Sequence, residues 1–168
     1  GMYTVYRFDP GNPHSLSSNN VSKIYEDHAG VLWICTTAGG INTFDRRTEG
    51  FVRYIPDPDN PTSLSSVTIA SIFEDRSGIL WFGTGVSGID YFDREIEKFR
   101  SYRVDPDNPN SLSHNIVYSL FEDRFGVLWI ATNGGGLNKY DRRNGQFTHY
   151  RADPGNPNGL SSDLIFSI

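Results

Sequence analysis

Residues 64–93 read LSSVTIASIFEDRSGILWFGTGVSGIDYFD, and this stretch decides the fold. Its apolar runs are rich in β-branched and aromatic residues, which is typical of β-strands. The segment 74–78 (EDRSG) has acidic residues at its start and a glycine at its end, the composition of a tight hairpin turn. Together with the apolar run that follows, the stretch predicts a four-stranded antiparallel meander with strands at 68–73, 79–84, 88–93 and 98–104.

The same pattern occurs three times at a fixed step. The tryptophans show the spacing, since 81 − 33 = 48 and 129 − 81 = 48. The corresponding stretches are LSSNNVSKIYEDHAGVLWICTTAGGINTFD (16–45) and LSHNIVYSLFEDRFGVLWIATNGGGLNKYD (112–141). The complete units span 15–62, 63–110 and 111–158. Residues 3–14 match the end of a unit and residues 159–168 match the start of one, so a partial repeat is expected at each end of the chain.

The first predicted strand of each unit is apolar in two columns. One column holds Val21, Ile69, Val117 and Ile165, and the other holds Ile24, Ile72, Leu120 and Ile168. Because side chains alternate along a strand, we place the two columns on opposite faces of the sheet. A sheet with two apolar faces must be covered on both sides by its neighbours. Face-to-face stacking of one small sheet per roughly 40–50 residues is the β-propeller arrangement.

The sequence therefore predicts an all-β chain, with residues 1–168 forming part of a β-propeller. Three complete four-stranded antiparallel blades are expected at 15–62, 63–110 and 111–158. Residues 3–14 are expected to supply the outer strand and link of a preceding blade, and residues 159–168 the inner strand of a following blade. Three blades cover less than half of a typical ring, so the open blade ends predict self-association. The residues expected to be buried against a neighbouring chain are Leu164, Phe166 and Ile168.

The recurring pattern LSS…EDxxGxLWxxTxxGG…D resembles the two-component regulator propeller repeat over essentially the whole chain. The resemblance implies the periplasmic sensor region of a hybrid two-component sensor kinase, here as a fragment or a short stand-alone member. It implies a non-catalytic, ligand-sensing role, with oligosaccharides as the expected ligand class. It also implies a periplasmic or extracytoplasmic location if the chain is part of a full sensor, although the chain shows no targeting signal. A structural or protein-interaction segment is the alternative, and a streptogramin-lyase-like enzyme is a more distant one.

The residues that repeat in every unit are interpreted as structural. They are Trp33, Trp81, Trp129, Asp27, Asp75, Asp123, Gly30, Gly78 and Gly126. The paired acidic residues of each turn point to opposite faces and lie one pair per blade, so they do not converge as catalytic carboxylates. The histidines occupy different columns without metal-ligand spacing, at His14, His28, His114 and His149. The sequence therefore predicts no enzyme, no metal site and no cofactor.

The candidate ligand face lies where a propeller opens near its axis. There, the link into the first strand and the turn between the second and third strands lie on one side of the blades. Residues at these places vary between units, whereas the structural residues of the repeat do not. The amide, hydroxyl and imidazole groups of the varying residues suit hydrogen bonds to sugar hydroxyls. The candidates are Asn19, Asn20, Thr37, Thr68, His114, Asn115 and Asn133. The repeated Arg46, Arg94 and Arg142 are interpreted as structural ion pairs or exposed surface.

Composition excludes several other classes of partner. The net charge is −5, with 15 basic and 20 acidic residues spread through the units, so the basic face of a nucleic-acid-binding protein is absent from the sequence. No apolar run reaches the roughly 18 residues of a membrane span, and no direct membrane insertion is expected. Cys35 is the single cysteine, which excludes an internal disulfide, and it is expected to be a small buried residue.

Overall fold

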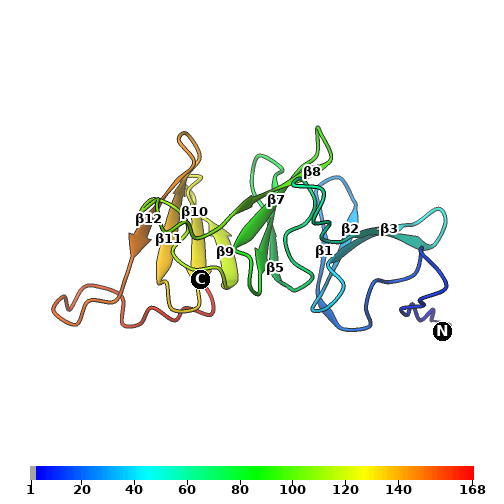
Figure 1. Cartoon of the computed structure of the whole chain (residues 1–168), viewed down its shortest axis with the longest axis horizontal. Coiled ribbons are helices and arrows are strands. Elements are labelled where there is room, and N and C mark those ends of the chain that lie inside the picture. Colours follow the sequence, from blue (N-terminus) through cyan, green and yellow to red (C-terminus); the bar gives the residue numbers. More distant parts are fainter. Residues whose placement is uncertain (1–2) are drawn as a thin grey trace.

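The computed structural model describes residues 3–168, which form twelve strands in three four-stranded antiparallel sheets (Figure 1). Blade 1 consists of β1 (Val21–Glu26), β2 (Leu32–Thr36), β3 (Ile41–Asp45) and β4 (Gly50–Tyr54). Blade 2 consists of β5 (Ile69–Glu74), β6 (Leu80–Thr84), β7 (Ile89–Asp93) and β8 (Lys98–Tyr102). Blade 3 consists of β9 (Val117–Glu122), β10 (Leu128–Thr132), β11 (Leu137–Asp141) and β12 (Gln146–Tyr150). Each sheet keeps its strands in sequence order, and the prediction of all-β propeller blades is confirmed. Within residues 3–168, no helix is long and apolar enough to cross a membrane.

An aspartate and a glycine build the turn between the first two strands of each blade. In blade 2, Asp75 Oδ1 accepts hydrogen bonds from the backbone N–H groups of Ser77 (2.9 Å) and Ile79 (3.1 Å). Gly78 closes the turn with φ at +83°, in the left-handed region that a β-carbon disfavours. Blades 1 and 3 have the same bonds and the same glycine conformation. These local requirements explain why the acidic residue and the glycine keep a fixed spacing.

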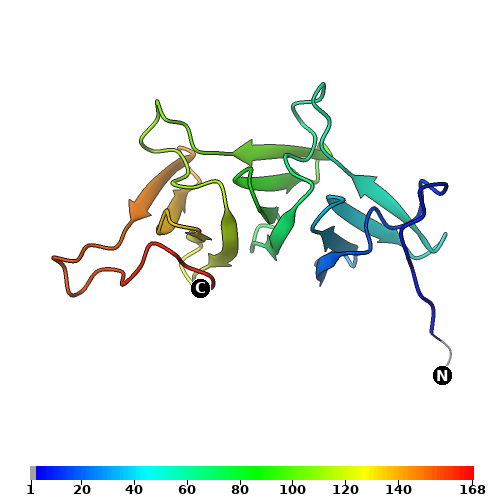
Figure 2. The same ribbon diagram turned by 60° about the horizontal axis from the view of Figure 1, so that its bottom comes forward.

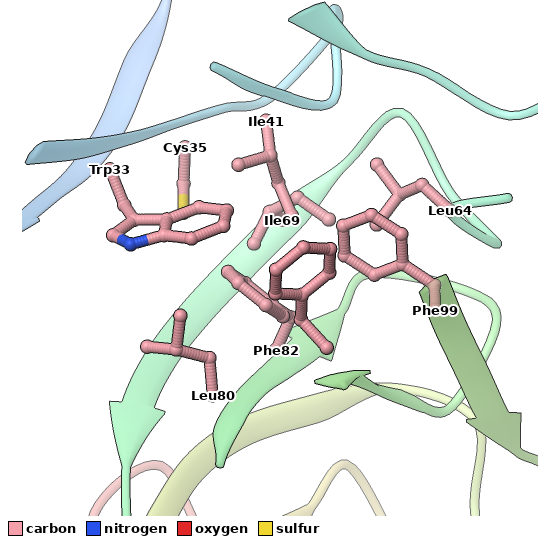
Figure 3. Close-up of a cluster of buried hydrophobic side chains, with 9 residues drawn as sticks. Trp33, Cys35, Ile41, Leu64, Ile69, Leu80, Phe82 and Phe99 are labelled. Carbon is pink, nitrogen blue, oxygen red and sulfur yellow. The ribbon is translucent and has the colours of Figure 1, made fainter. Parts of the chain in front are cut away.

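The three blades stand side by side in an arc (Figures 1 and 2). Neighbouring blades meet through their first and second strands, β1 and β2 with β5, and β5 and β6 with β9. In the core between blades 1 and 2, side chains from the two sheets point toward one another (Figure 3). The blade 1 contribution is Trp33, Cys35 and Ile41, and the blade 2 contribution includes Ile69, Leu80 and Phe82. An equivalent core lies between blades 2 and 3.

A β-bulge in the first strand of each blade corrects the predicted faces. In blade 2, the pairing of β5 with β6 shifts between Ile69 and Ser71, which leaves Ala70 as an extra residue. The bulge brings Ile69 and Ile72 onto one face, and both pack into the core between blades 1 and 2. The same shift occurs in β1 and β9. The prediction that the two apolar columns lie on opposite faces is therefore wrong, because the extra residue cancels one alternation.

The N-terminal segment does not form the outer strand that was expected of it. Residues 3–8 contain only an isolated bridge, from Phe8 to Leu16. Tyr6 instead packs edge-on against Phe44 of blade 1, with 5.2 Å between ring centroids. A strand needs a neighbouring backbone to satisfy its N–H and C=O groups, and among residues 3–168 no third strand of a preceding blade lies beside this segment.

The C-terminal segment likewise forms no regular strand. Residues 159–168 are attached to blade 3 through isolated bridges, one of them between Leu164 and Asn133. Phe166 stacks on Tyr118, the bulged residue of β9, with 5.1 Å between ring centroids. Leu164 and Phe166 remain 42% and 66% exposed. The segment begins to follow the course of an inner strand, but it belongs to none of the three sheets that residues 3–168 form.

Candidate functional site

The two loops predicted to form the ligand face meet at one end of each blade, which we call the rim. In blade 1, the N–H of Thr37 in the β2–β3 loop donates to the carbonyl of Asn20 in the link, at 3.0 Å. Blades 2 and 3 contain the corresponding bond. The hydroxyl of Thr68 in blade 2 donates to the carbonyl of Thr37 in blade 1 at 2.9 Å. The structure therefore brings Asn20, Thr37 and Thr68 together at the rim of blades 1 and 2.

Asn19 and Asn115 hold the links between blades. Asn19 Oδ1 accepts a hydrogen bond from the N–H of Phe8 at 2.8 Å. Asn115 Oδ1 accepts one from the N–H of Val104 at 2.9 Å. These bonds satisfy backbone donors that no strand pairs. The structure thus gives these two candidates a scaffold role.

The link between blades 1 and 2 lacks this bond at both of its ends. Pro56 occupies the donor position, because 56 − 8 = 48, and proline has no N–H. Val67 occupies the acceptor position, because 67 − 19 = 48, and its side chain cannot accept. Donor and acceptor are thus replaced together, and no backbone N–H loses its partner.

The remaining candidates also lie at the rim, and they differ in whether their side chains form intramolecular hydrogen bonds. His114 Nδ1 accepts a hydrogen bond from the N–H of Ile116 at 3.1 Å, a role that serine hydroxyls play in blades 1 and 2. Asn133 follows β10, and its N–H donates to the carbonyl of Ile116 at 3.0 Å. Within residues 3–168, no intramolecular hydrogen bond engages the side chains of Asn20, Thr37 and Asn133.

A repeated ion-pair network, which we call the clasp, joins neighbouring blades at the end opposite the rim. Arg94, which follows β7, has Nη2 at 2.9 Å from Asp27 Oδ2 of blade 1 and at 2.9 Å from Glu74 Oε1 of its own blade. Arg142 makes the same two contacts between blades 2 and 3, at 2.7 and 3.3 Å. The carboxyl groups of Asp27 and Glu74 are almost fully buried, whereas the Arg94 side chain is 30% exposed. The repeated arginines therefore form ion pairs at the edge of each blade interface.

The clasp sets the ionisation of the turn aspartates. Burial raises the pKa of Asp27, but the hydrogen bonds donated by the Trp33 indole and the Val31 N–H, with the charge of Arg94, outweigh burial and lower it. The Trp33 indole donates to Asp27 Oδ2 at 2.5 Å. The ionised carboxylate thus holds a core tryptophan, a turn and the neighbouring blade at the same time.

Three segments of the chain match the family model described as "Two component regulator propeller", at residues 15–38, 63–85 and 111–134. Each match covers the same part of a blade, from the link through the first strand, the aspartate–glycine turn and the second strand. The chain belongs to the two-component regulator propeller family. The spacing of the three matches is the 48-residue step of the repeat, since 63 − 15 = 48 and 111 − 63 = 48.

Solved structures similar to this regulator propeller chain come from B. thetaiotaomicron. The chain is 27% identical to an extracellular domain assigned to a hybrid two component system, with a TM-score of 0.78 over 90% of this chain and 20% of that one. A second extracellular domain with the same assignment is 27% identical, with a TM-score of 0.71 over 96% of this chain and 22% of that one. The chain thus spans about a fifth of the length of these solved structures. No curated protein matches the chain.

The histidine, cysteine and acidic side chains of this regulator propeller lie in several separate places. Within residues 3–168, no group of three or more His, Cys, Asp or Glu side chains is arranged to hold a metal ion. His28 Nδ1 lies 3.1 Å from Glu74 Oε2, beside the clasp and away from the rim. Cys35 is fully buried, and burial raises the pKa of its thiol to about 12, which disfavours the thiolate form.

Blade 2 differs from the other blades at two positions that we did not single out from the sequence. Asp90 on β7 and Ser101 on β8 face each other, and the Ser101 hydroxyl donates to Asp90 Oδ1 at 2.6 Å. The sequence does show the difference, because the residue types at these two repeat positions change in blade 2. At the corresponding positions, blade 1 has Asn42 and Arg53, and blade 3 has Asn138 and His149.

Proposed function

We propose that the chain is a recognition segment of the extracytoplasmic part of a two-component sensor, and that an oligosaccharide binds at its rim. The observation that supports the binding site is the set of polar side chains there without intramolecular partners, Asn20, Thr37 and Asn133. Amide and hydroxyl groups can donate to and accept from sugar hydroxyls. The family match and the likeness to extracellular sensor domains support the location. The proposed role requires no catalytic step.

Calorimetric titration of the purified chain with a panel of oligosaccharides tests the proposal. For a sugar that binds, Asn20→Ala and Asn133→Ala should each weaken binding about two- to tenfold, since one hydrogen bond contributes about 0.5–1.5 kcal/mol. Gln146→Ala is the matched control, because Gln146 is exposed at the start of β12, at the opposite end of blade 3 from the rim. Equal binding by all three variants would remove the rim as the site, and no binding by any sugar would contradict the ligand class.

A protein-interaction role is the second candidate, and the uncovered faces of blades 1 and 3 favour it. Val21 and Ile24 are 42% and 65% exposed on blade 1, and Phe121 is 47% exposed on blade 3. Apolar side chains gathered on one face commonly mark a contact with another protein. If the rim variants Asn20→Ala and Asn133→Ala lose sugar binding but still associate with another protein, the two roles are separate.

A further inference from the structure

Blade 2 contains a cavity that belongs neither to the rim nor to the clasp. It has a volume of about 370 Å³ and lies between the link 56–65 and the end of β8. Ser63 and Ser65 line it from the link, and Ser101 and Arg103 line it from the strand side. What it can hold follows from the equivalent place in the other two blades.

In blade 1, a guanidinium group fills the equivalent place. Arg53 Nε donates to the carbonyl of Ser15 at 2.8 Å. Its Nη2 donates to the Ser15 hydroxyl at 2.7 Å and to the carbonyls of Asn12 and Leu16 at 2.9 and 3.1 Å. The link before blade 1 is therefore curved into a set of oxygen acceptors around an arginine side chain. Blade 3 fills the place with His149, whose Nε2 lies 2.7 Å from the corresponding serine carbonyl.

Blade 2 keeps the acceptors, but in the described part of the chain no cation is hydrogen-bonded to them. Ser101 stands at the position of Arg53, and its hydroxyl donates to Asp90. Arg103 lies exposed at the cavity wall, and its charge partly offsets the effect of burial on the pKa of Asp90. Within residues 3–168, no arginine, lysine or histidine side chain donates to the link acceptors of blade 2. By the 48-residue step, these acceptors are the carbonyls of Asn60, Ser63 and Leu64 and the hydroxyl of Ser63.

A buried carboxyl group lies directly behind this cavity. In blade 1, Asn42 Nδ2 donates to Ser17 Oγ at 2.8 Å, and the asparagine of blade 3 makes the same bond. An ionised Asp90 has no N–H to donate; it accepts a hydrogen bond from the backbone N–H of Ser65 at 2.8 Å, and Ser65 Oγ is buried without a hydrogen-bond partner. The Asp90 side chain belongs to a residue with 0% exposure, and burial raises its pKa. Blade 2 thus holds an unengaged hydroxyl and an acidic group that its two neighbours do not have.

We propose that the cavity of blade 2 binds a ligand carrying a guanidinium group, which takes the place that Arg53 fills in blade 1. Relative to blade 1, this place has lost the arginine at Ser101 and gained a carboxyl group at Asp90, while Arg103 at its wall replaces Ile55 of blade 1. Guanidinium is planar and directs several donors outward at fixed angles, which matches acceptors that surround it in one link. The carboxyl group behind the wall favours a cation over a neutral ligand.

Calorimetric titration of the whole chain with methylguanidine tests the proposal, with tetramethylammonium as a cation that has no N–H donor. Saturable binding of methylguanidine alone is expected. Ser101→Arg supplies the missing cation from within, so it should weaken methylguanidine binding at least tenfold and raise the melting temperature. Arg53→Ser is the reciprocal variant, because it opens the same place in blade 1. Added methylguanidine should restore part of the melting temperature that this variant loses.

Three results would overturn the proposal. Methylguanidine binding that is unchanged by Ser101→Arg would show that the ligand sits elsewhere. Equal binding of tetramethylammonium would reduce the effect to attraction between charges. Third, if methylguanidine binds the Arg103→Gln variant but not the original chain, then Arg103 itself occupies the cavity in solution.

Discussion

At the scale of single residues, Trp81 connects three parts of the molecule. Its side chain is 2% exposed in the core between blades 2 and 3, and its indole donates to Asp75 Oδ2 at 2.7 Å. The ring centroid of Tyr140 lies 5.5 Å away, and the Arg142 guanidinium lies 5.8 Å from the Trp81 ring. Trp81 therefore ties the turn of its own blade to the core and to the next clasp.

Trp81→Ala is expected to lower the free energy of unfolding by about 3–5 kcal/mol, the usual cost of truncating a large buried aromatic. Urea unfolding followed by circular dichroism measures it. Trp129 is the matched control, because it holds the same repeat position on the uncovered side of blade 3, where it is only half-buried. Trp129→Ala should therefore cost clearly less. A loss below about 1 kcal/mol for Trp81→Ala would show that the ring is not packed between blades.

Asp90→Asn is expected to stabilise the chain near neutral pH by about 1–2 kcal/mol. The amide supplies the donor that Ser65 Oγ lacks and removes a carboxylate that burial disfavours. These gains outweigh the loss of one of the two oxygens that accept from the Ser65 N–H and the Ser101 hydroxyl. Because the folded-state pKa of Asp90 is raised, stability is lost as the pH rises through that pKa and regained below it. The advantage of asparagine should thus shrink on acidification.

Chemical unfolding of the variant and the original chain at matched pH values measures this difference. The comparison is needed because the lowered pKa of Asp27 and Asp75 removes stability from both proteins as the pH falls through those pKa values. An advantage that stays constant between neutral pH and about pH 4 would contradict the assignment to Asp90 ionisation.

Residue roles at the rim were only partly predictable from sequence. The loops chosen from the variable columns lie together in the structure, since Asn20, Thr37 and Thr68 meet there, and their role in binding stays a prediction. The columns could not show that Asn19 and Asn115 accept hydrogen bonds from residues eleven positions earlier, because the path of the link is a property of the packed blades. The exchange at Asp90 and Ser101 was readable as a break in the repeat, but its meaning required the contacts of Arg53.

At the scale of single elements, the turn between β7 and β8 contains a strained residue. Glu97 has φ at +52°, in the left-handed region that costs a residue with a β-carbon about 1 kcal/mol or more. Blade 1 places Glu49 in the same conformation, with φ at +54°. Blade 3 has Gly145 at this position, with φ at +70° and nothing within 4 Å of the site of a β-carbon.

Glu97→Gly is expected to raise the free energy of unfolding by about 0.5–1 kcal/mol, because it relieves the left-handed strain. Glu95→Gly in the same turn is the control. Glu95 is exposed and has no positive φ, so its replacement should bring no gain. Thermal unfolding of the two variants gives the comparison, and equal effects would mean that the strain at Glu97 is not significant.

Strand number and turn positions followed from local chemistry, whereas the faces of the first strands did not. Alternation placed Ile69 and Ile72 on opposite sides, because no residue type marks the bulge at Ala70. Blades 1 and 3 have Ser22 and Tyr118 at the bulge, so its sequence varies freely. The terminal segments have the apolar pattern of strands, but each makes only isolated bridges to the three described sheets.

At the scale of the whole molecule, each end presents half of a clasp. Arg46 of blade 1 pairs with Glu26 of its own blade at 2.8 Å, and within residues 3–168 it has no aspartate of a preceding blade. Asp123 of blade 3 accepts the Trp129 indole at 3.0 Å, and no arginine of a following blade reaches it within the same residues. The two halves have opposite charges and equivalent positions in the repeat.

We propose that a second copy of the chain docks head to tail, with blade 1 of one copy against blade 3 of another and Arg46 beside Asp123. The docked β1 would displace residues 159–168 from blade 3. Light scattering after size exclusion should then show a dimer or larger assembly, because such a contact can repeat until a ring closes.

Charge exchange provides the control for this association. Arg46→Asp and Asp123→Arg should each weaken it, and the double variant should recover it. A monodisperse monomer of about 19 kDa for the original chain would contradict the proposal.

The joint replacement at Pro56 and Val67 constrains where recombination can divide this repeat. The two positions are 67 − 56 = 11 residues apart and fall on either side of the boundary at 62–63. In a tandem duplication of 63–110, the Val104 of the first copy would face the Val67 of the second copy in place of Asn115. The N–H of Val104 would then have no acceptor. A duplication of 46–93, which is also 48 residues long, would carry both members of the pair together and preserve the link. The 48-residue unit that can be duplicated without losing this hydrogen bond therefore begins and ends inside sheets, and does not coincide with one four-stranded blade.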